Sequence, residues 1–265
     1  MSIDLSIVIP LHNEELNVAP LHEELSGVLA SMGVAYEILM VDDGSTDATF
    51  AVLQQIHATD PHVRVVRFTR NFGQTAAFAA AFTVARGRLI VTCDGDLQND
   101  PTDIPRLVEM AKTHDVVCGW RKDRKDDFVT RYLPSFFANQ LLSIVSGVHL
   151  HDTGCSLKVF RAEVVKPLKL TPGMHRYLPV LASQLGGGRV TEVVVNHRPR
   201  QFGTSKYGLS RTFRVLADLF TLRRLMRAAV DPATSAPELY EVAEVLEPRA
   251  QSPEPKAQSP EPEAR

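Results

Sequence analysis

Two aspartates, Asp94 and Asp96, stand two positions apart at the end of the apolar run Leu89–Asp94. Because side chains alternate along a strand, both carboxylates can leave the backbone on the same side. Two close carboxylates repel each other unless a cation lies between them, and a hard divalent cation completed by substrate phosphates suits such a pair. Gln98 continues the alternation and can add a neutral oxygen. An Asp-x-Asp pair alone is also typical of a solvated turn, but its place after a buried strand favours the cation site.

A second acidic pair, Asp42 and Asp43, follows the apolar run Ile38–Val41. The Gly44–Asp47 turn then opens into a helical pattern. Helix capping by the turn does not account for two acids at the tip of a strand. Carboxylates at this place suit hydrogen bonds to a nucleobase or a ribose.

The elements that must position these acids alternate along the first half of the chain. Short β-branched runs alternate with helical patterns, which predicts a mostly parallel, Rossmann-like sheet flanked by helices. Ligands of such sheets bind beyond the carboxyl ends of the strands, where both acidic pairs and His12–Glu15 are expected to lie. The predicted strands are Leu5–Pro10, Tyr36–Asp42, Val63–Thr69, Leu89–Asp94, Asp115–Gly119 and Val190–Asn196, and the predicted helices are Glu15–Met32, Asp47–Thr59, Thr75–Arg86 and Ile104–Thr113.

The second half of the chain carries two amphipathic helical patterns, at residues 131–147 and 209–230. With aromatic residues on one side and arginines on the other, these helices either lie in a membrane interface or pack on the domain. We expect one catalytic domain over residues 1–230. Residues 231–265 contain a twice-repeated Pro/Glu motif that cannot bury a core, so they are predicted to be a disordered tail.

Composition limits the function classes. The chain has 265 residues, 44% of them hydrophobic and 23% charged, which is typical of a globular protein. The net charge is −2, but the run Arg198–Arg227 is strongly basic, with Asp218 as its single acid. This run either meets phosphates or an anionic membrane surface, or forms a solvated helix face. No nucleic-acid partner is expected.

The cysteines and apolar segments indicate the compartment. Cys93, Cys118 and Cys155 are odd in number and widely spaced, which fits neither a disulfide framework nor a zinc site. The N-terminus has no signal-peptide pattern, and no apolar run reaches the ~20 residues of a membrane span. We therefore expect a protein at the cytoplasmic face of the membrane, bound peripherally or through a small membrane-anchoring partner.

Seven short motifs follow one another between residues 3 and 228, and their order is more specific than any one of them. They are Ser6–Pro10 with Asn13-Glu14, Val41–Asp47, Asn71–Gln74, Asp94–Gln98, His151–Lys158, Met174–Arg176 and Arg200–Gly208.

The first four motifs resemble the family 2 glycosyltransferases with the GT-A fold, and the last three narrow the resemblance to the polyprenol/dolichol-phosphate sugar synthases. The resemblance implies transfer of a sugar from a nucleoside-diphosphate sugar to a polyprenyl or dolichyl phosphate. GDP-mannose and UDP-glucose both fit as donors. The implied donor-site residues are Pro10, Glu14, Asp42 and Asp43 around the nucleoside, Asp94, Asp96 and Gln98 around Mg²⁺ or Mn²⁺, and Arg200, Ser205 and Lys206 over the diphosphate.

The family also places basic residues near the acceptor phosphate. Arg121 or Arg124, then Arg131, with Ser135 one helical turn later, match that pattern. Fork-like guanidinium donors suit phosphate oxygens. The alternative is plain surface charge, because three aspartates interleave with these arginines.

The implied mechanism is a single in-line displacement that inverts the anomeric carbon. The metal with Arg200 and Lys206 would stabilise the nucleoside diphosphate as it leaves. The acceptor phosphate is already an anion and needs orientation more than deprotonation. Asp152 stands where related enzymes keep a general base, but here it could equally orient a donor hydroxyl or a basic side chain. Asp96, Asp152 and Arg131 are the predicted catalytic residues.

Two alternatives remain open. One is a related enzyme that acts on a sugar hydroxyl or a protein, or a nucleotidyltransferase. The other is a catalytically silent nucleotide-sugar sensor, although every acid of the metal motif is present.

The chain also departs from many bacterial relatives, because a Pro/Glu tail stands where they continue into two membrane-spanning helices.

Overall fold

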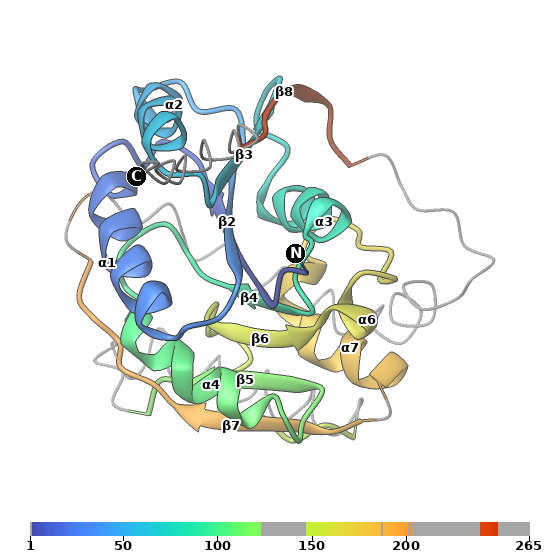
Figure 1. Ribbon diagram of the computed structural model, residues 1–265. Coiled ribbons are helices and arrows are strands. Elements are labelled where there is room, and N and C mark those ends of the chain that lie inside the picture. Colours follow the sequence, from blue (N-terminus) through green and yellow to red (C-terminus); the bar gives the residue numbers. More distant parts are fainter. Residues whose placement is uncertain (1, 123–146, 187, 201, 203–238, 249–265) are drawn as a thin grey trace, which may run out of the picture.

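The β-branched runs form one eight-stranded sheet with the strand order β7-β5-β6-β4-β1-β2-β3-β8. The computed structural model describes residues 2–122, 147–186, 188–200, 202 and 239–248. Helices cover both faces of the sheet (Figure 1). The α/β architecture expected from the sequence is confirmed.

Four parallel strands form the part of the sheet that carries the acidic pairs. They are β1 (Leu5–Leu11), β2 (Tyr36–Asp42), β3 (Val63–Phe68) and β4 (Leu89–Thr92). β1 pairs with β2 on one side and with β4 on the other, and β3 pairs with β2. The strand order therefore reverses beside β1, which is the place where ligands bind in open α/β sheets. The strands predicted here are confirmed, with small differences at their ends.

Helices α1 (Val18–Ser31), α2 (Thr49–Thr59) and α4 (Ile104–Met110) cover one face of the sheet. A 3₁₀ turn, η1 (Pro101–Asp103), leads into α4. The apolar residues of α1 recur every three or four positions, so they form one stripe that is buried against the strands.

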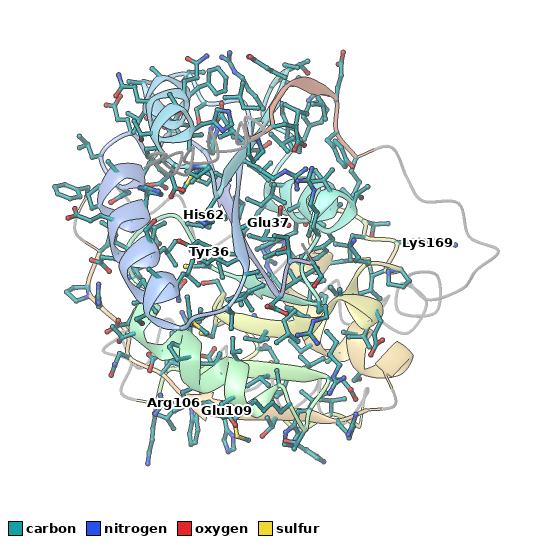
Figure 2. The ribbon with its side chains drawn as sticks, in the orientation of Figure 1. Tyr36, Glu37, His62, Arg106, Glu109 and Lys169 are labelled. Atoms are coloured by element: carbon teal, nitrogen blue, oxygen red, sulfur yellow. The ribbon has the colours of Figure 1, made fainter. Side chains whose placement is uncertain are left out.

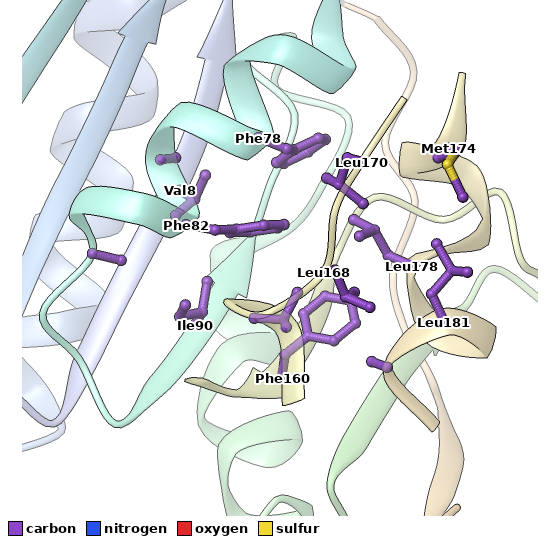
Figure 3. Close-up of a cluster of buried hydrophobic side chains, with 14 of the residues drawn as sticks. Val8, Phe78, Phe82, Ile90, Phe160, Leu168, Leu170, Met174, Leu178 and Leu181 are labelled. Carbon is purple, nitrogen blue, oxygen red and sulfur yellow. The ribbon is translucent and has the colours of Figure 1, made fainter. Parts of the chain in front are cut away.

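The other face is covered by α3 (Gln74–Val84), α6 (Ala162–Val165), η3 (Met174–Tyr177) and α7 (Leu178–Gly186). Figure 3 shows Phe78 and Phe82 of α3 together with leucines of the α6–α7 region in one cluster on this face of the sheet. α3 is rich in alanine and is buried along most of its length. Because alanine side chains are small, the helix packs closely on the sheet, and its first residues lie near the sheet edge.

Strands β5 (Val116–Trp120), β6 (Lys158–Arg161) and β7 (Val190–Val194) extend the sheet beyond β4. β6, which the sequence analysis does not predict, runs antiparallel between β4 and β5, whereas β7 runs parallel to β5. This arrangement brings the segments after β5 and before β6 to the edge that carries the acidic pairs.

The predicted disordered tail is wrong for residues 239–248. They contain β8 (Val242–Leu246), which pairs antiparallel with β3 at the edge of the sheet. Four of its five residues are apolar (Val-Ala-Glu-Val-Leu), but its side chains are mostly exposed and do not alternate between a buried and an exposed face, so the sequence lacks the period-two pattern of a half-buried strand. The repeats of the tail lie outside the described residues, as do the predicted helices 131–147 and 209–230 apart from Gly147. Within the described part of the chain, no helix has the length and apolar character that crossing a bilayer requires.

Candidate active site

The loops after β1 and β2 are joined by hydrogen bonds. The Asn13 N–H donates to Ser45 Oγ at 2.9 Å, and Asn13 Oδ1 accepts from the Thr46 N–H at 2.8 Å. The Glu14 N–H donates to Thr49 Oγ1 at 2.8 Å. Asn13 has a φ of 54°, a left-handed conformation that Asn tolerates better than most residues. Glu14, a predicted nucleoside-binding residue, is thereby fixed at the carboxyl edge of the sheet.

The carboxylate of Asp43 holds the loop that follows β3. Its oxygens accept the N–H groups of Phe72 at 2.7 Å and of Gly73 at 2.9 Å. Burial raises the pKa of Asp43, and these two N–H donors oppose the shift. Asp42 is fully buried and lies 3.6 Å from Arg67, measured from Oδ2 to Nε. Both acids therefore shape the loops, and their contact with a base or ribose stays a prediction.

Gln74 connects this loop to the other acidic pair. Its Nε2 donates to Asp94 Oδ1 at 2.9 Å, and the backbone N–H of Asp94 donates to Asn99 Oδ1 at 3.0 Å. The tips of β2 and β4 are thus linked through the loop after β3. Gln74 belongs to the motif Asn71–Gln74, but its role could not be predicted from the sequence, because nothing in the local pattern identifies its partner.

Asp94 and Asp96 lie in one electrostatic environment, as their spacing predicts. Asp96 is only 8% exposed. Burial raises its pKa to about 6, and the charges of Asp94 and Glu14 act in the same direction. Arg200 opposes them, because its Nη2 lies 2.6 Å from Asp96 Oδ2. The strand tips after β1 and β4 therefore meet at one site, which Asp43 joins through the Gln74 link.

The donor set at this site suits a hard divalent cation that a ligand completes. Asp94 and Asp96 repel each other in a partly buried place, which a cation between them would relieve. Among the described residues there is no group of three or more Asp, Glu, His or Cys side chains that could hold a metal. Asp94 and Asp96 are the carboxylates that the described part of the chain places to hold such an ion, and substrate phosphates and water would add further ligands. Gln98 directs Nε2 toward the Arg198 carbonyl at 3.4 Å, so its role as a ligand stays a prediction.

Arg121 and Asp152 form an ion pair on the β5 side of the site. Arg121 donates from Nε to Asp152 Oδ2 at 2.7 Å and from Nη2 to Oδ1 at 2.9 Å. Burial raises the pKa of Asp152, but Arg121 more than offsets this and leaves the pKa below its usual value. Burial lowers the pKa of Arg121, which Asp152 and, more weakly, Asp94 raise above the ordinary value. Of the roles considered for Asp152, orientation of a basic side chain is the one this geometry favours.

Arg198 is a site residue that sequence reasoning missed. It forms ion pairs with Glu24 at 2.6 Å and with Asp100 at 2.8 Å, and its backbone N–H donates to the Gln98 carbonyl at 3.0 Å. These bonds lay the segment after β7 along the loop after β4, which brings Arg200 to Asp96. The sequence shows Arg198 only as the start of a basic run, without its acidic partners.

Several predicted site residues lie outside the described part of the chain. Pro10 stands in β1 opposite Val41, and Arg121 and Arg200 occupy the positions given above. The predicted residues without a described position are Arg124, Arg131, Ser135, Ser205 and Lys206.

The sequence model of glycosyl transferase family 2 matches residues 6–168, which span both acidic pairs and the Arg121–Asp152 ion pair. The chain belongs to this family. The glycosyltransferase is 46% identical over 235 residues to a dodecaprenyl-phosphate galacturonate synthase of Rhizobium johnstonii, covering 87% of this chain and 70% of the relative. It is 38% identical over 220 residues to an undecaprenyl-phosphate 4-deoxy-4-formamido-L-arabinose transferase of Edwardsiella ictaluri, covering 82% and 67%. The expected resemblance to polyprenyl-phosphate sugar synthases is confirmed.

Solved structures confirm the GT-A fold of the glycosyltransferase. Mannosyl-3-phosphoglycerate synthase from Rubrobacter xylanophilus matches with a TM-score of 0.67 and 17% identity, covering 93% of this chain and 89% of that one. Glucosyl-3-phosphoglycerate synthase from Mycobacterium tuberculosis, in complex with Mn²⁺ and UDP-glucose, matches with a TM-score of 0.65 and 19% identity, covering 83% and 79%. At these identities the likeness concerns the fold alone.

Proposed function

We propose that this glycosyltransferase moves a sugar from a nucleoside-diphosphate donor to the phosphate of a polyprenyl lipid, with inversion at the anomeric carbon. The names of two relatives describe enzymes that act on polyprenyl phosphates, and the chain covers about two thirds of the length of each. The observation that carries the choice of acceptor is the ion pair of Arg121 with Asp152.

On the donor side, the chain supplies two carboxylates and an arginine on neighbouring loops. Asp94 and Asp96 would hold Mg²⁺ or Mn²⁺ against the diphosphate, where the ion would neutralise charge on the leaving group. Arg200 already contacts Asp96, so its guanidinium would lie beside a diphosphate bound there and could donate to its oxygens. Ser205 and Lys206 complete this group in our proposal, and Gln98 adds an oxygen.

On the acceptor side, Arg121 would bind the lipid phosphate. A guanidinium carries five N–H donors in a fixed plane, and Asp152 accepts from two of them on one edge. The remaining edge is oriented by that contact, and Asp94 lies close enough to influence the pKa of Arg121. The phosphate would therefore be held beside the donor site, with Arg124, Arg131 and Ser135 as further predicted contacts.

The state of Asp152 argues against an acceptor that must be deprotonated. A carboxylate whose pKa is lowered, and whose two oxygens are both bound by Arg121, is a weak general base. A sugar hydroxyl requires such a base, whereas a phosphate monoester is an anion at neutral pH. The main task of the site residues is then to hold the donor diphosphate and the acceptor phosphate close together, although these two anions repel each other.

The identity of the sugar is part of the proposal. Mannose and glucose are the sugars predicted from the sequence, and the names of the two relatives add galacturonate and formamido-arabinose as candidates. We further propose that the enzyme works peripherally at the cytoplasmic face of the membrane, either directly or through a small anchoring partner. The basic run Arg198–Arg227 supports this, because anionic lipids attract clustered Lys and Arg.

A donor panel tests the proposal. Thermal shifts with Mn²⁺ and GDP-mannose, UDP-glucose or UDP-galacturonate identify the donor, and radiolabelled sugar is then offered to undecaprenyl phosphate in detergent. We expect a glycolipid and free nucleoside diphosphate. Release of pyrophosphate would identify a nucleotidyltransferase, transfer only to hydroxyl acceptors would refute the choice of acceptor, and binding without any turnover would favour a sensor.

A further inference from the structure

The segment Leu239–Pro248 returns to the sheet and covers the free edge of β3 (Figure 1). β8 pairs with β3 from Val65 opposite Leu246 to Phe68 opposite Val242, with an irregularity between Arg67 and Phe68. None of the site residues lies in this segment. It nevertheless continues past the end of β3, beside the loop that Asp43 holds.

Tyr240 packs on the aromatic side chains at the end of β3. Its ring stacks on Phe68 with 5.1 Å between centroids and 11° between planes, and Phe68 meets Phe72 edge-on at 5.8 Å. Beside this stack, the Thr69 N–H donates to the Glu241 carbonyl at 3.1 Å. The loop after β3 is therefore held on one side by the C-terminal segment.

The same loop is held on its other side by the active site. The backbone N–H of Phe72 donates to Asp43, and Gln74, two residues on, donates to Asp94. A continuous series of contacts thus runs from Tyr240 through Phe68 and Phe72 to the acids of the donor site. An aromatic stack restrains a loop without contacting the ligand, because it limits the positions of the backbone to which it is attached.

A second, separate anchor holds the other end of the segment. Glu247 accepts from Arg64 Nη2 at 2.6 Å and Nε at 3.0 Å, and from Arg86 Nη2 at 2.7 Å. Arg64 is buried and also donates to Glu37 at 2.9 Å. Figure 2 places Glu37 on β2, and this anchor lies near the start of β3, whereas the donor site lies beyond its end. It therefore stabilises β8 without contacting the loop.

We propose that Tyr240 is a positioning residue, which fixes the loop Arg70–Gln74 in the shape that the donor site needs. This inference rests on the proposed function of the site. It assigns different roles to the residues that flank β8: Tyr240, before the strand, acts on donor binding, and Glu247, after it, acts on stability. The hydroxyl of Tyr240 plays no part in the stack.

Three variants of the full-length protein separate the two roles. Tyr240→Ala removes the stack, Tyr240→Phe keeps it, and Glu247→Gln weakens only the distant anchor. Hydrogen exchange at the Phe72 and Gly73 amides reports on the loop, calorimetry with UDP or GDP and Mn²⁺ reports on the donor site, and thermal unfolding reports on stability.

We expect faster exchange of the Phe72 and Gly73 amides in Tyr240→Ala and about three- to tenfold weaker nucleotide binding, as loss of one aromatic contact implies. Tyr240→Phe should behave as the wild type in both measurements. Glu247→Gln should lower the melting temperature and leave both unchanged. Equal effects of Tyr240→Ala and Glu247→Gln, or no effect of Tyr240→Ala on exchange, would overturn the inference. If the wild type binds neither nucleotide, the proposed function is wrong, and the exchange data still decide whether Tyr240 holds the loop.

Discussion

Arg121 and Asp152, which are 31 positions apart in the sequence, face each other as a two-pronged ion pair with both contacts below 3 Å. The backbone of Asp152 is held in turn by β7, since its N–H donates to Glu192 Oε1 at 3.0 Å. The Asp152 carboxylate therefore orients the Arg121 guanidinium, and the guanidinium is the group that can bind an anion.

Replacement of Asp152 with Asn tests this relationship. Asn cannot accept from Arg121 at both oxygens, so the guanidinium loses its fixed orientation. We expect kcat/KM for the lipid acceptor to fall about 10- to 100-fold, the usual effect of losing a supporting contact. Because the pKa of Asp152 is already lowered, its carboxylate stays ionised from neutral to mildly acidic pH, and the pH–rate profile of the variant should keep its shape. Loss of the acidic limb of that profile in Asp152→Asn would instead identify a general base.

Replacement of Asp96 with Asn removes one of the two carboxylates expected to bind the metal. We expect turnover to fall by more than about 100-fold, because loss of a ligand exceeds the effect of losing a residue behind it. The fold should persist, as measured by circular dichroism, since the pKa of about 6 indicates that Asp96 is costly to ionise in the free protein. Turnover near the wild-type rate would refute the metal assignment.

Arg200 neutralises Asp96 in the donor-free protein and would have to leave it when a cation binds. In Arg200→Gln we therefore expect tighter Mn²⁺ binding without donor and weaker binding of the nucleoside diphosphate with Mn²⁺. Titration of free Mn²⁺ by electron paramagnetic resonance measures the first, and calorimetry the second. The matched control is Arg88→Gln, which removes an exposed arginine that pairs with Asp4 just before β1, at the opposite edge of the sheet. Weaker Mn²⁺ binding in Arg200→Gln than in the control would contradict this account.

Two glycines should respond oppositely to alanine. At Gly44, φ is +62°, and an added Cβ would lie 2.2 Å from the backbone carbon of Arg70. Gly44→Ala should lower the free energy of unfolding by about 2 kcal/mol or more, because strain and overlap add. Gly27 lies within helix α1 with nothing within 4 Å of an added Cβ. Gly27→Ala should therefore raise the free energy of unfolding by about 0.5–1 kcal/mol. Urea titration of both variants measures the difference, and destabilisation by Gly27→Ala would contradict the open space described there.

The sequence by itself determined the parts of this protein that depend on local patterns. Alternation of apolar strands with amphipathic helices is a property of neighbouring residues, so the parallel sheet and the strand ends that carry Asp43 and Asp94 could be predicted. Parallel strands bring their carboxyl ends to one edge, and the meeting of Asp94 and Asp96 with Glu14 follows from that rule.

Only the tertiary structure decided which distant side chains become partners. Gln74 donates to Asp94, Arg121 pairs with Asp152, and Arg64 pairs with Glu247, 183 positions away. Such pairs depend on strand register and on how loops pack, which no periodicity in the sequence encodes. β8 was missed for a related reason: an edge strand is held by main-chain hydrogen bonds, which every residue except proline can make, so its sequence carries no signature of its place.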